Sequence, residues 1–276
     1  MTALLLALGA SLAWGVADFV GPLISRTYGA LPVLFWAQIG GVAGIGIAIA
    51  VRGDGPPGWG VLYAVLASIG GMLGIVAYYR GMVEGAMSVV APIAGVSAVI
   101  PVVFGIATGD HPSATQICGI VCALAGVGFA SIEHQEGRRR IAAGVGLALL
   151  AAAGFGFYFP WMHAAGKVDF WWASFVFRAT ALLLVGSIVA ARRPPLRFSP
   201  KLLVVVFAVG LGDTLGNVFF AASSHHGGLV SLTSVLASLY PVVTVLLAAS
   251  VLKERVARLQ KAGIVLTLAG VVLISI

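Results

Sequence analysis

Long apolar runs separated by short polar breaks make up almost the whole chain. Each run is about 20 residues long, the length of helix that crosses the roughly 30 Å hydrocarbon core of a membrane. Strict alternation of apolar and polar residues, which marks barrel strands, is absent from these runs. The pattern therefore predicts an all-α membrane protein with ten transmembrane helices, at residues 3–24, 32–51, 59–79, 88–107, 114–132, 142–161, 171–190, 201–221, 229–250 and 260–276.

The second half of the chain repeats the first. Residues 116–132 and 260–276 share ten identities in seventeen positions, at an offset of 144. Trp14 matches Phe155 at an offset of 141. Because five is odd, a second repeat of five helices enters the membrane upside down relative to the first, which is an architecture of secondary transporters. The sequence thus predicts an inverted repeat of two five-helix halves, residues 1–135 and 141–276.

Composition supports membrane insertion and argues against other partners. The chain is 60% hydrophobic and 9% charged, with a mean hydropathy of +1.08, whereas soluble domains carry about 25% charged residues. Its partners are expected to be the lipid bilayer and a small-molecule substrate. The net charge of +7 reflects basic loops rather than a nucleic-acid surface. Cys118 and Cys122 lie one helical turn apart without a metal-binding cluster, so we expect neither metal nor cofactor.

The basic residues are divided unequally between the loops. The loops after even-numbered spans hold only Arg52 and Lys167. By the positive-inside rule the other loops are cytoplasmic and both termini lie outside. We expect the protein to be a monomer that spans the inner (plasma) membrane. Those other loops hold 13 basic residues: Arg26, Arg80, Arg138, Arg139, Arg140, Arg192, Arg193, Arg197, Lys201, Lys253, Arg255, Arg258 and Lys261.

Several motifs resemble those of one known group of transporters. They are "AWG" in the first span, the "P…G" end of the fourth, and the ending "LKERVARLQKAGIVLTLAGVVLI" with Glu254, Gln260, Gly263 and Gly270. Together with five plus five spans, they resemble the EamA-type exporters of the drug/metabolite transporter superfamily, with the aromatic amino-acid exporters as neighbours. The resemblance implies a basket-shaped bundle around a central cavity lined by spans 1, 3, 4, 6, 8 and 9. It also implies both termini inside, which disagrees with the charge count.

Three charged residues lie inside the predicted spans: Asp18, Arg178 and Asp213. An acid at a helix centre costs about 2.5–3.5 kcal/mol on insertion scales, so such groups are functional candidates. Asp213 shares a helix face with Asn217, four residues later. Asp213 either binds a substrate ammonium or a coupling proton, with Asp18 across the cavity, or forms a structural pair with Arg178. The sequence leaves both interpretations open.

Small, aromatic and proline residues suggest the surroundings of these charges. Gly212 and Gly216 form a small-xxx-small pair that admits a close neighbour. The matched prolines Pro101 and Pro241, at an offset of 140, each remove a helix hydrogen bond, as at broken helices beside midplane sites. Tyr79, near a span end with Trp161, Trp171 and Trp172, fits an interfacial belt. The predicted cavity-lining residues are Trp14, Asp18, Gln38, Tyr78, Ser97, Pro101, Tyr158, Asp213, Asn217, Ser234, Ser238 and Pro241.

The sequence therefore predicts a secondary transporter that exports a small organic metabolite by alternating access, with amino acids, aromatic or otherwise amphipathic, as the first candidates. Coupling to protons and passive facilitation both stay open. An intramembrane aspartyl protease is the alternative, because "GLGD" at residues 210–213 has the form G-x-G-D and Asp18 could supply the second acid. We expect that the protein is not an enzyme, and we assign no catalytic residue.

Overall fold

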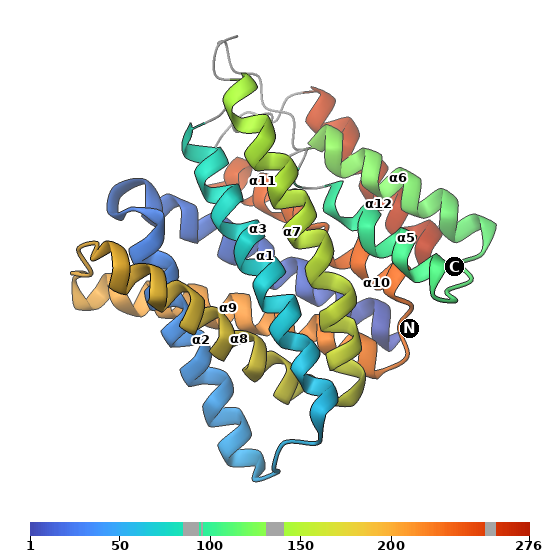
Figure 1. Ribbon diagram of the computed structural model, residues 1–276. Coiled ribbons are helices and arrows are strands. Elements are labelled where there is room, and N and C mark those ends of the chain that lie inside the picture. The colour runs from blue at the N-terminus through green and yellow to red at the C-terminus, as the bar shows by residue number, and fades with distance from the viewer. Residues whose placement is uncertain (85–93, 95, 131–140, 252–257) are drawn as a thin grey trace.

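The protein is a bundle of helices, with no strand among the residues that the structure describes. The computed structural model describes residues 1–84, 94, 96–130, 141–251 and 258–276 (Figure 1). Predictions for residues 88–93 and 131–135 and for Arg138, Arg139, Arg140, Lys253, Glu254 and Arg255 lie outside the described residues. The helices are α1 (Thr2–Tyr28), α2 (Ala30–Arg52), η1 (Trp59–Leu62), α3 (Tyr63–Glu84), η2 (Val96–Ala98), α5 (Val99–Ala107), α6 (Ala114–Ala130), α7 (Ile141–Val168), α8 (Phe170–Arg192), α9 (Pro200–His225), α10 (Val230–Ala237), α11 (Tyr240–Val251) and α12 (Arg258–Ser275).

Most helices are long and apolar enough to cross a membrane. Within the described residues there are seven such segments, supplied by α1, α2, η1 with α3, α7, α8, α9, and α10 with α11. Two more apolar helices are shorter, at Ala114–Phe129 and Lys261–Ile274. The helices confirm an all-α, multi-pass membrane protein, whereas the total of ten spans stays a prediction.

The helices α2 and α8 begin and end at matched residues. Both α2 and α8 are 23 residues long, and they begin at Ala30 and Phe170, 140 residues apart. The residue before α2 is Gly29, which offers no side-chain cap. The residue before α8 is Asp169, whose carboxylate accepts the backbone N–H groups of Trp171 and Trp172 at 2.9 Å. The start of the helix is thus repeated while its cap differs.

Both matched prolines lie next to interruptions of a helix. Pro101 is in the first turn of α5, directly after the 3-10 turn η2. Pro241 follows a break in which α10 ends at Ala237 and α11 begins at Tyr240. A proline has no backbone N–H, so the carbonyl one turn earlier loses its helical partner. The interrupted segments also pack on each other, since α10 contacts both η2 and α5.

The packing of helices stays the same when the two halves are exchanged. The helix α3 packs along α7 as α1 packs along α9, and α2 packs on α9 as α3 packs on α8. The helices α6 and α12, which end the halves, lie side by side (Figure 1). Each half is therefore built around the other rather than folded as a separate unit.

Glycines bring α6 and α12 into backbone contact. A Cβ atom on Gly119 would lie 2.9 Å from the carbonyl oxygen of Gly270, and one on Gly126 would lie 2.7 Å from that of Gly263. Gly119 and Gly263 are counterparts at the offset of 144 seen in the sequence, as are Gly126 and Gly270. Each glycine thus faces the counterpart of the other, which makes the two helices antiparallel. Small residues allow such close approach in membranes.

Loops that should share a side of the membrane lie together. After α2, Arg52 forms an ion pair with Asp169, with 2.8 Å between Nη2 and Oδ2. At the opposite end of α2, the indole N–H of Trp36 donates to the carbonyl of Leu196, between α8 and α9, at 3.0 Å. The loops after the second and sixth predicted spans thus meet at one end of α2, and the loop after the seventh lies at the other end.

Candidate functional site

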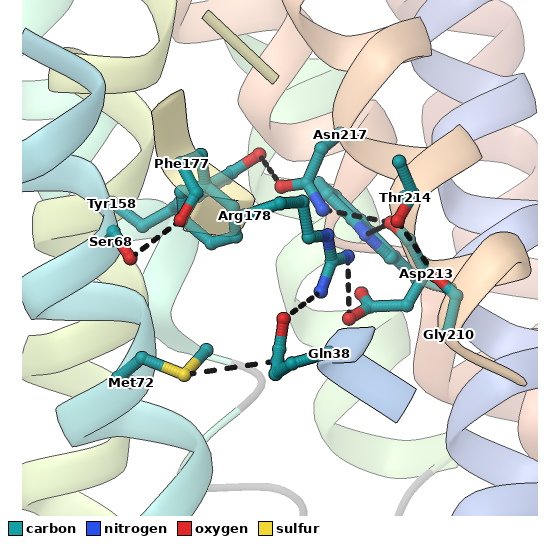
Figure 2. Close-up of polar contacts among 11 residues, drawn as sticks. Gln38, Ser68, Met72, Tyr158, Phe177, Arg178, Gly210, Asp213, Thr214 and Asn217 are labelled. Carbon is teal, nitrogen blue, oxygen red and sulfur yellow. Dashed lines mark hydrogen bonds and ion pairs between the residues drawn. The ribbon is translucent and has the colours of Figure 1, made fainter. Parts of the chain in front are cut away.

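A fully buried arginine on α8 holds together a polar network between the halves (Figure 2). The Nη1 atom of Arg178 donates to Oε1 of Gln38 on α2 at 2.9 Å. Its Nη2 atom lies 2.6 Å from Oδ2 of Asp213 on α9, an ion pair rather than an aligned hydrogen bond. The amide nitrogen of Gln38 in turn lies 3.9 Å from the sulfur of Met72 on α3. Asp213 therefore supplies the negative charge that a buried guanidinium needs.

This network joins residues that correspond between the halves. Gln38 and Arg178 are 140 residues apart, the same spacing as the starts of α2 and α8. Met72 and Asp213 lie at an offset of 141, as Trp14 and Phe155 do. The contact from Gln38 to Met72 in the first half thus corresponds to the ion pair from Arg178 to Asp213 in the second. The helix positions are thus repeated at this site, whereas the charged side chains occur in the second half only.

The backbone carbonyl of Asp213 accepts two side-chain hydrogen bonds. It accepts the side-chain amide of Asn217 at 2.8 Å and the indole N–H of Trp14, on α1, at 3.2 Å. The hydroxyl of Tyr158, on α7, donates to Oδ1 of Asn217 at 2.7 Å. The side chain of Asp213 is still 38% exposed. One face of α9 therefore holds the network while its acid stays accessible.

The glycines around Asp213 differ in how tightly they are packed. A Cβ atom on Gly216 would overlap the indole ring of Trp14, and one on Gly210 would overlap the carbonyl of Ala37. The nearest atom to a Cβ on Gly212 would be 3.9 Å away. The sequence pairs Gly212 with Gly216, but the tight contacts are at Gly210 and Gly216. Predicting them requires the crossing points of α2 and α1 on α9, which spacing alone does not give.

A cavity of about 100 Å³ lies between the halves beside this network. Its walls come from α1, α2 and α3 of the first half and from α7, α8, α9 and α11 of the second. Arg178 is not part of its surface, whereas Asp18 and Asp213 both are. The lining residues are Trp14, Asp18, Leu34, Gln38, Gly71, Met72, Ile75, Tyr79, Phe155, Tyr158, Phe159, Phe177, Asp213, Asn217 and Tyr240.

Comparison with known proteins identifies the family. The sequence matches the EamA-like transporter family over residues 1–132 and 142–276. The chain belongs to this family. It is therefore a multi-pass membrane transporter of small molecules, in a family of transporters rather than enzymes, and the resemblance to the drug/metabolite transporter superfamily is confirmed.

A solved structure shares the fold of this EamA-like transporter. It is a crystal structure described only as that of a protein, and it superposes with a TM-score of 0.76 at 19% sequence identity. The match covers 98% of this chain and 95% of the other. No curated protein sequence matches significantly. The likeness therefore establishes the fold, and the substrate has to be inferred from the residues of the site.

Half of the residues predicted for the cavity of this EamA-like transporter line it. They are Trp14, Asp18, Gln38, Tyr158, Asp213 and Asn217. The others are buried in the helix packing and are not among the lining residues: Tyr78, Ser97, Pro101, Ser234, Ser238 and Pro241. Among the described atoms the hydroxyls of Ser97 and Ser234 have no hydrogen-bond partner, and that of Ser238 donates to the carbonyl of Val235 at 2.9 Å.

Of the neighbouring residues Tyr78 and Tyr79, the structure places the second in the cavity wall, whereas the sequence predicted the first. Tyr79, which the sequence assigns to an interfacial belt, lines the cavity. Tyr78, the predicted lining residue, packs edge-on against Tyr79 and Phe155 at ring distances of 6.3 and 5.9 Å. Successive residues point about 100° apart around a helix, and the sequence does not fix the rotation of α3.

The site also contains residues that the sequence did not suggest. Tyr240 lines the cavity at the start of α11, and its place directly before Pro241 was a usable signal. Phe177 lines it next to Arg178, whose guanidinium carbon lies 5.5 Å from the ring centre. The aliphatic and thioether residues that complete the wall, such as Met72, carry no such signal. Within the described residues, no group of three His, Cys, Asp or Glu side chains could hold a metal ion.

Proposed function

We propose that this EamA-like transporter is a secondary transporter that exports a small organic metabolite by alternating access. The observation that carries the proposal is the cavity, because residues of both halves line it and its acids lie within membrane-spanning helices. If the halves are inverted repeats, rocking one against the other opens the same cavity to either side in turn. The protein would act as a monomer, since one chain supplies every wall.

Asp213 is the proposed proton-coupling group. Its carboxylate is partly exposed in the cavity while its partner Arg178 is fully buried. A proton arriving through the cavity can thus reach Asp213 without passing the arginine. Protonation would remove the ion pair and leave Arg178 with its hydrogen bond to Gln38, which would loosen α8 from α9. The structural and the coupling roles of the pair are then two states of one contact.

The proposed cargo has an ammonium group and an apolar or aromatic body. Amino acids were the first candidates from the sequence, and the acids and aromatic rings of the cavity support a cargo of that general kind. The aspartyl protease alternative gains no support. Such a protease needs two carboxylates that share a proton, whereas Arg178 binds the carboxylate of Asp213.

The proposed orientation follows the charge count. The loops after odd-numbered spans, including that between α8 and α9 with Arg193 and Arg197, face the cytoplasm of a cell with this protein in its inner membrane. Both termini then lie outside. A reporter fused to the C-terminus distinguishes this orientation from the opposite one that the superfamily resemblance implies.

Counterflow into proteoliposomes tests transport directly. Vesicles loaded with one unlabelled compound are diluted into the same compound carrying a radiolabel, across a panel of amines, amino acids, sugars and nucleotides. We expect accumulation for amphipathic compounds with an ammonium group. Accumulation of no compound, with correctly inserted protein, would contradict a transporter of small metabolites.

A further inference from the structure

The charges that face the cavity are of one sign. Of the lining residues, all of which the structure describes, Asp18 and Asp213 are acidic and none is basic. Arg178 is the nearest cation in the network, and its side chain has no exposed surface. Its guanidinium is turned toward Gln38 and Asp213. A molecule in the cavity therefore meets carboxylates and no guanidinium.

Asp18 differs from Asp213 because no described residue supplies it with a counter-charge. Asp213 is ion-paired with Arg178 at 2.6 Å. Among the described residues, Asp18 has no hydrogen-bond or ion-pair partner, and it lies near enough to Asp213 for the two carboxylates to repel each other. An ionised acid within a membrane-spanning helix is strongly disfavoured unless a cation or a polar partner accompanies it. The ionised form of Asp18 thus depends on a cation that enters from the cavity.

Two tyrosine hydroxyls in the wall also have no partner among the described residues. Tyr79 and Tyr240 are each 8% exposed, and both line the cavity. Neither hydroxyl makes a hydrogen bond to any residue that the structure describes. Their oxygens can accept from an ammonium group, and ring faces attract cations when water is excluded. Further rings in the wall are Trp14, Phe155, Tyr158, Phe159 and Phe177.

Resting on the proposed transport function, we infer that the cavity selects an organic ammonium ion, whose charge is bound by Asp18 with the hydroxyls of Tyr79 and Tyr240. The aromatic walls hold the apolar body of the ligand. An amino acid adds a carboxylate, which finds two acids and no exposed base in this cavity. The inference thus narrows the cargo from amino acids to amines, because the second charge of an amino acid is repelled where the first is attracted.

Four compounds with the same ring and a similar short chain test this selection: phenethylamine, phenylalanine, phenethyl alcohol and phenylpropionate. They present a cation, a zwitterion, a neutral group and an anion. Affinities are measured by titration calorimetry on the purified full-length protein. We expect phenethylamine to bind at least about tenfold more tightly than each of the others, a difference of one charge interaction in a partly dehydrated site.

Substitutions show whether Asp18 is responsible. In Asp18→Asn we expect phenethylamine affinity to fall at least about tenfold while that of phenethyl alcohol stays unchanged. Asp54→Asn is the matched control, because Asp54 is an exposed acid after α2, paired with Arg52. It should leave all four affinities unchanged. Tyr240→Phe keeps the ring and removes only the hydroxyl, and we expect a loss of about two- to fivefold for the amine alone.

Three results overturn the inference: no binding of phenethylamine, equal or tighter binding of phenylalanine, or an Asp18→Asn affinity equal to that of Asp54→Asn. If Asp18→Asn does not elute as a monodisperse protein, the ranking of the four compounds and the Tyr240→Phe variant decide. Counterflow separates this inference from the proposed function. Uptake of phenylalanine or phenylpropionate without the amine contradicts amine selection and leaves transport standing. Selective amine binding without counterflow of any compound contradicts transport and leaves the site standing.

Discussion

The contact between Gln38 and Met72 in the first half and that between Arg178 and Asp213 in the second use matched residues of matched helices. The first is neutral, with 3.9 Å from the amide nitrogen to the sulfur. The second is an ion pair at 2.6 Å. A repeat can therefore keep its helix packing while one copy acquires the charges. The difference indicates that the repeated helix packing forms the scaffold, whereas the charge pair, present in one half only, serves the chemistry. Substitutions that make the two contacts alike test this interpretation.

Removing the buried cation should have the largest effect. Arg178→Gln makes the second half copy the first at this residue and leaves Asp213 without its counter-charge. Because breaking a buried ion pair costs about 3–5 kcal/mol, we expect a large drop in the thermal midpoint in detergent, together with loss of transport. Thermal unfolding followed by tryptophan fluorescence measures the first, and counterflow the second.

The double variant Arg178→Gln, Asp213→Met copies the neutral contact completely. Neutral replacement of a buried pair is often tolerated, so we expect most of the lost stability to return. Transport should not return, since no charge pair is left. Wild-type transport by the double variant would show that the charges are dispensable.

Removing only the acid should affect coupling next. Asp213→Asn keeps the size of the side chain but leaves the fully buried Arg178 without its counter-charge. We therefore expect a lower thermal midpoint, and transport driven by a pH gradient should fall at least about tenfold. Uptake rates in proteoliposomes from about pH 5 to about pH 8 measure this, with Asp54→Asn as the control. An Asp213→Asn rate equal to wild type across that range would make Asp213 purely structural.

Glycine substitutions test whether the scaffold is as symmetric as the contacts suggest. A Cβ atom on Gly74 would lie 2.6 Å from the ring of Phe155, and one on Gly216 would overlap the ring of Trp14, the counterpart of Phe155. We expect Gly74→Ala and Gly216→Ala to destabilise by similar amounts, about 1–3 kcal/mol each from overpacking. The thermal midpoint measures this.

Gly212→Ala is the matched control, because a Cβ there meets only ordinary contact distances. Its thermal midpoint should stay close to that of the wild type. A shift at Gly212 as large as that at Gly216 would contradict the assigned crossing of α1 on α9.

The smallest expected effect on stability is at the starts of α2 and α8, where Asp169 corresponds to Gly29 in the repeat. Burial by itself would raise the pKa of Asp169, but the hydrogen bonds from Arg52, Trp172 and Trp171 outweigh it and hold this pKa below its ordinary value. The stabilisation is thus present above about pH 3.9, the pKa of an unfolded aspartate, and is lost as the pH falls through the lower folded pKa.

Asp169→Asn measures this contribution. We expect a loss of under about 1 kcal/mol at neutral pH, seen as a thermal midpoint slightly below that of the wild type. The gap between the two proteins should narrow as the pH falls below about 4. A gap independent of pH would mean that the charge of Asp169 contributes nothing.

The repeat was the most productive signal in the sequence. It matches Pro101 with Pro241, both beside helix breaks, and Trp14 with Phe155, both in the cavity wall. Ionisable residues in apolar spans then identify Asp18, Arg178 and Asp213, all of which lie in or beside the site. Both signals are local in sequence, or repeat at a fixed spacing, so they need no knowledge of how helices cross.

What the sequence could not give depends on rotation and crossing. The exchange of Tyr78 and Tyr79 depends on how α3 is turned about its axis, and the tight glycines of α9 depend on where α1 and α2 cross it. The bond between Gln38 and Arg178 needs both helices in place. Ser234, Ser238 and Pro241 were predicted to line the cavity, but they are buried inside the bundle and are not among its lining residues.

The hydrogen bond between Gln38 and Arg178 joins a residue to its own counterpart. In a dimer of two separate, identical halves, such a residue would meet itself across the axis. Two glutamines could bond there but would bring no charge, and two arginines would place two like charges side by side. A single positive charge on the axis therefore requires two halves of different sequence. Divergence of the halves, which their fusion in one chain allows, is thus a chemical precondition of this site.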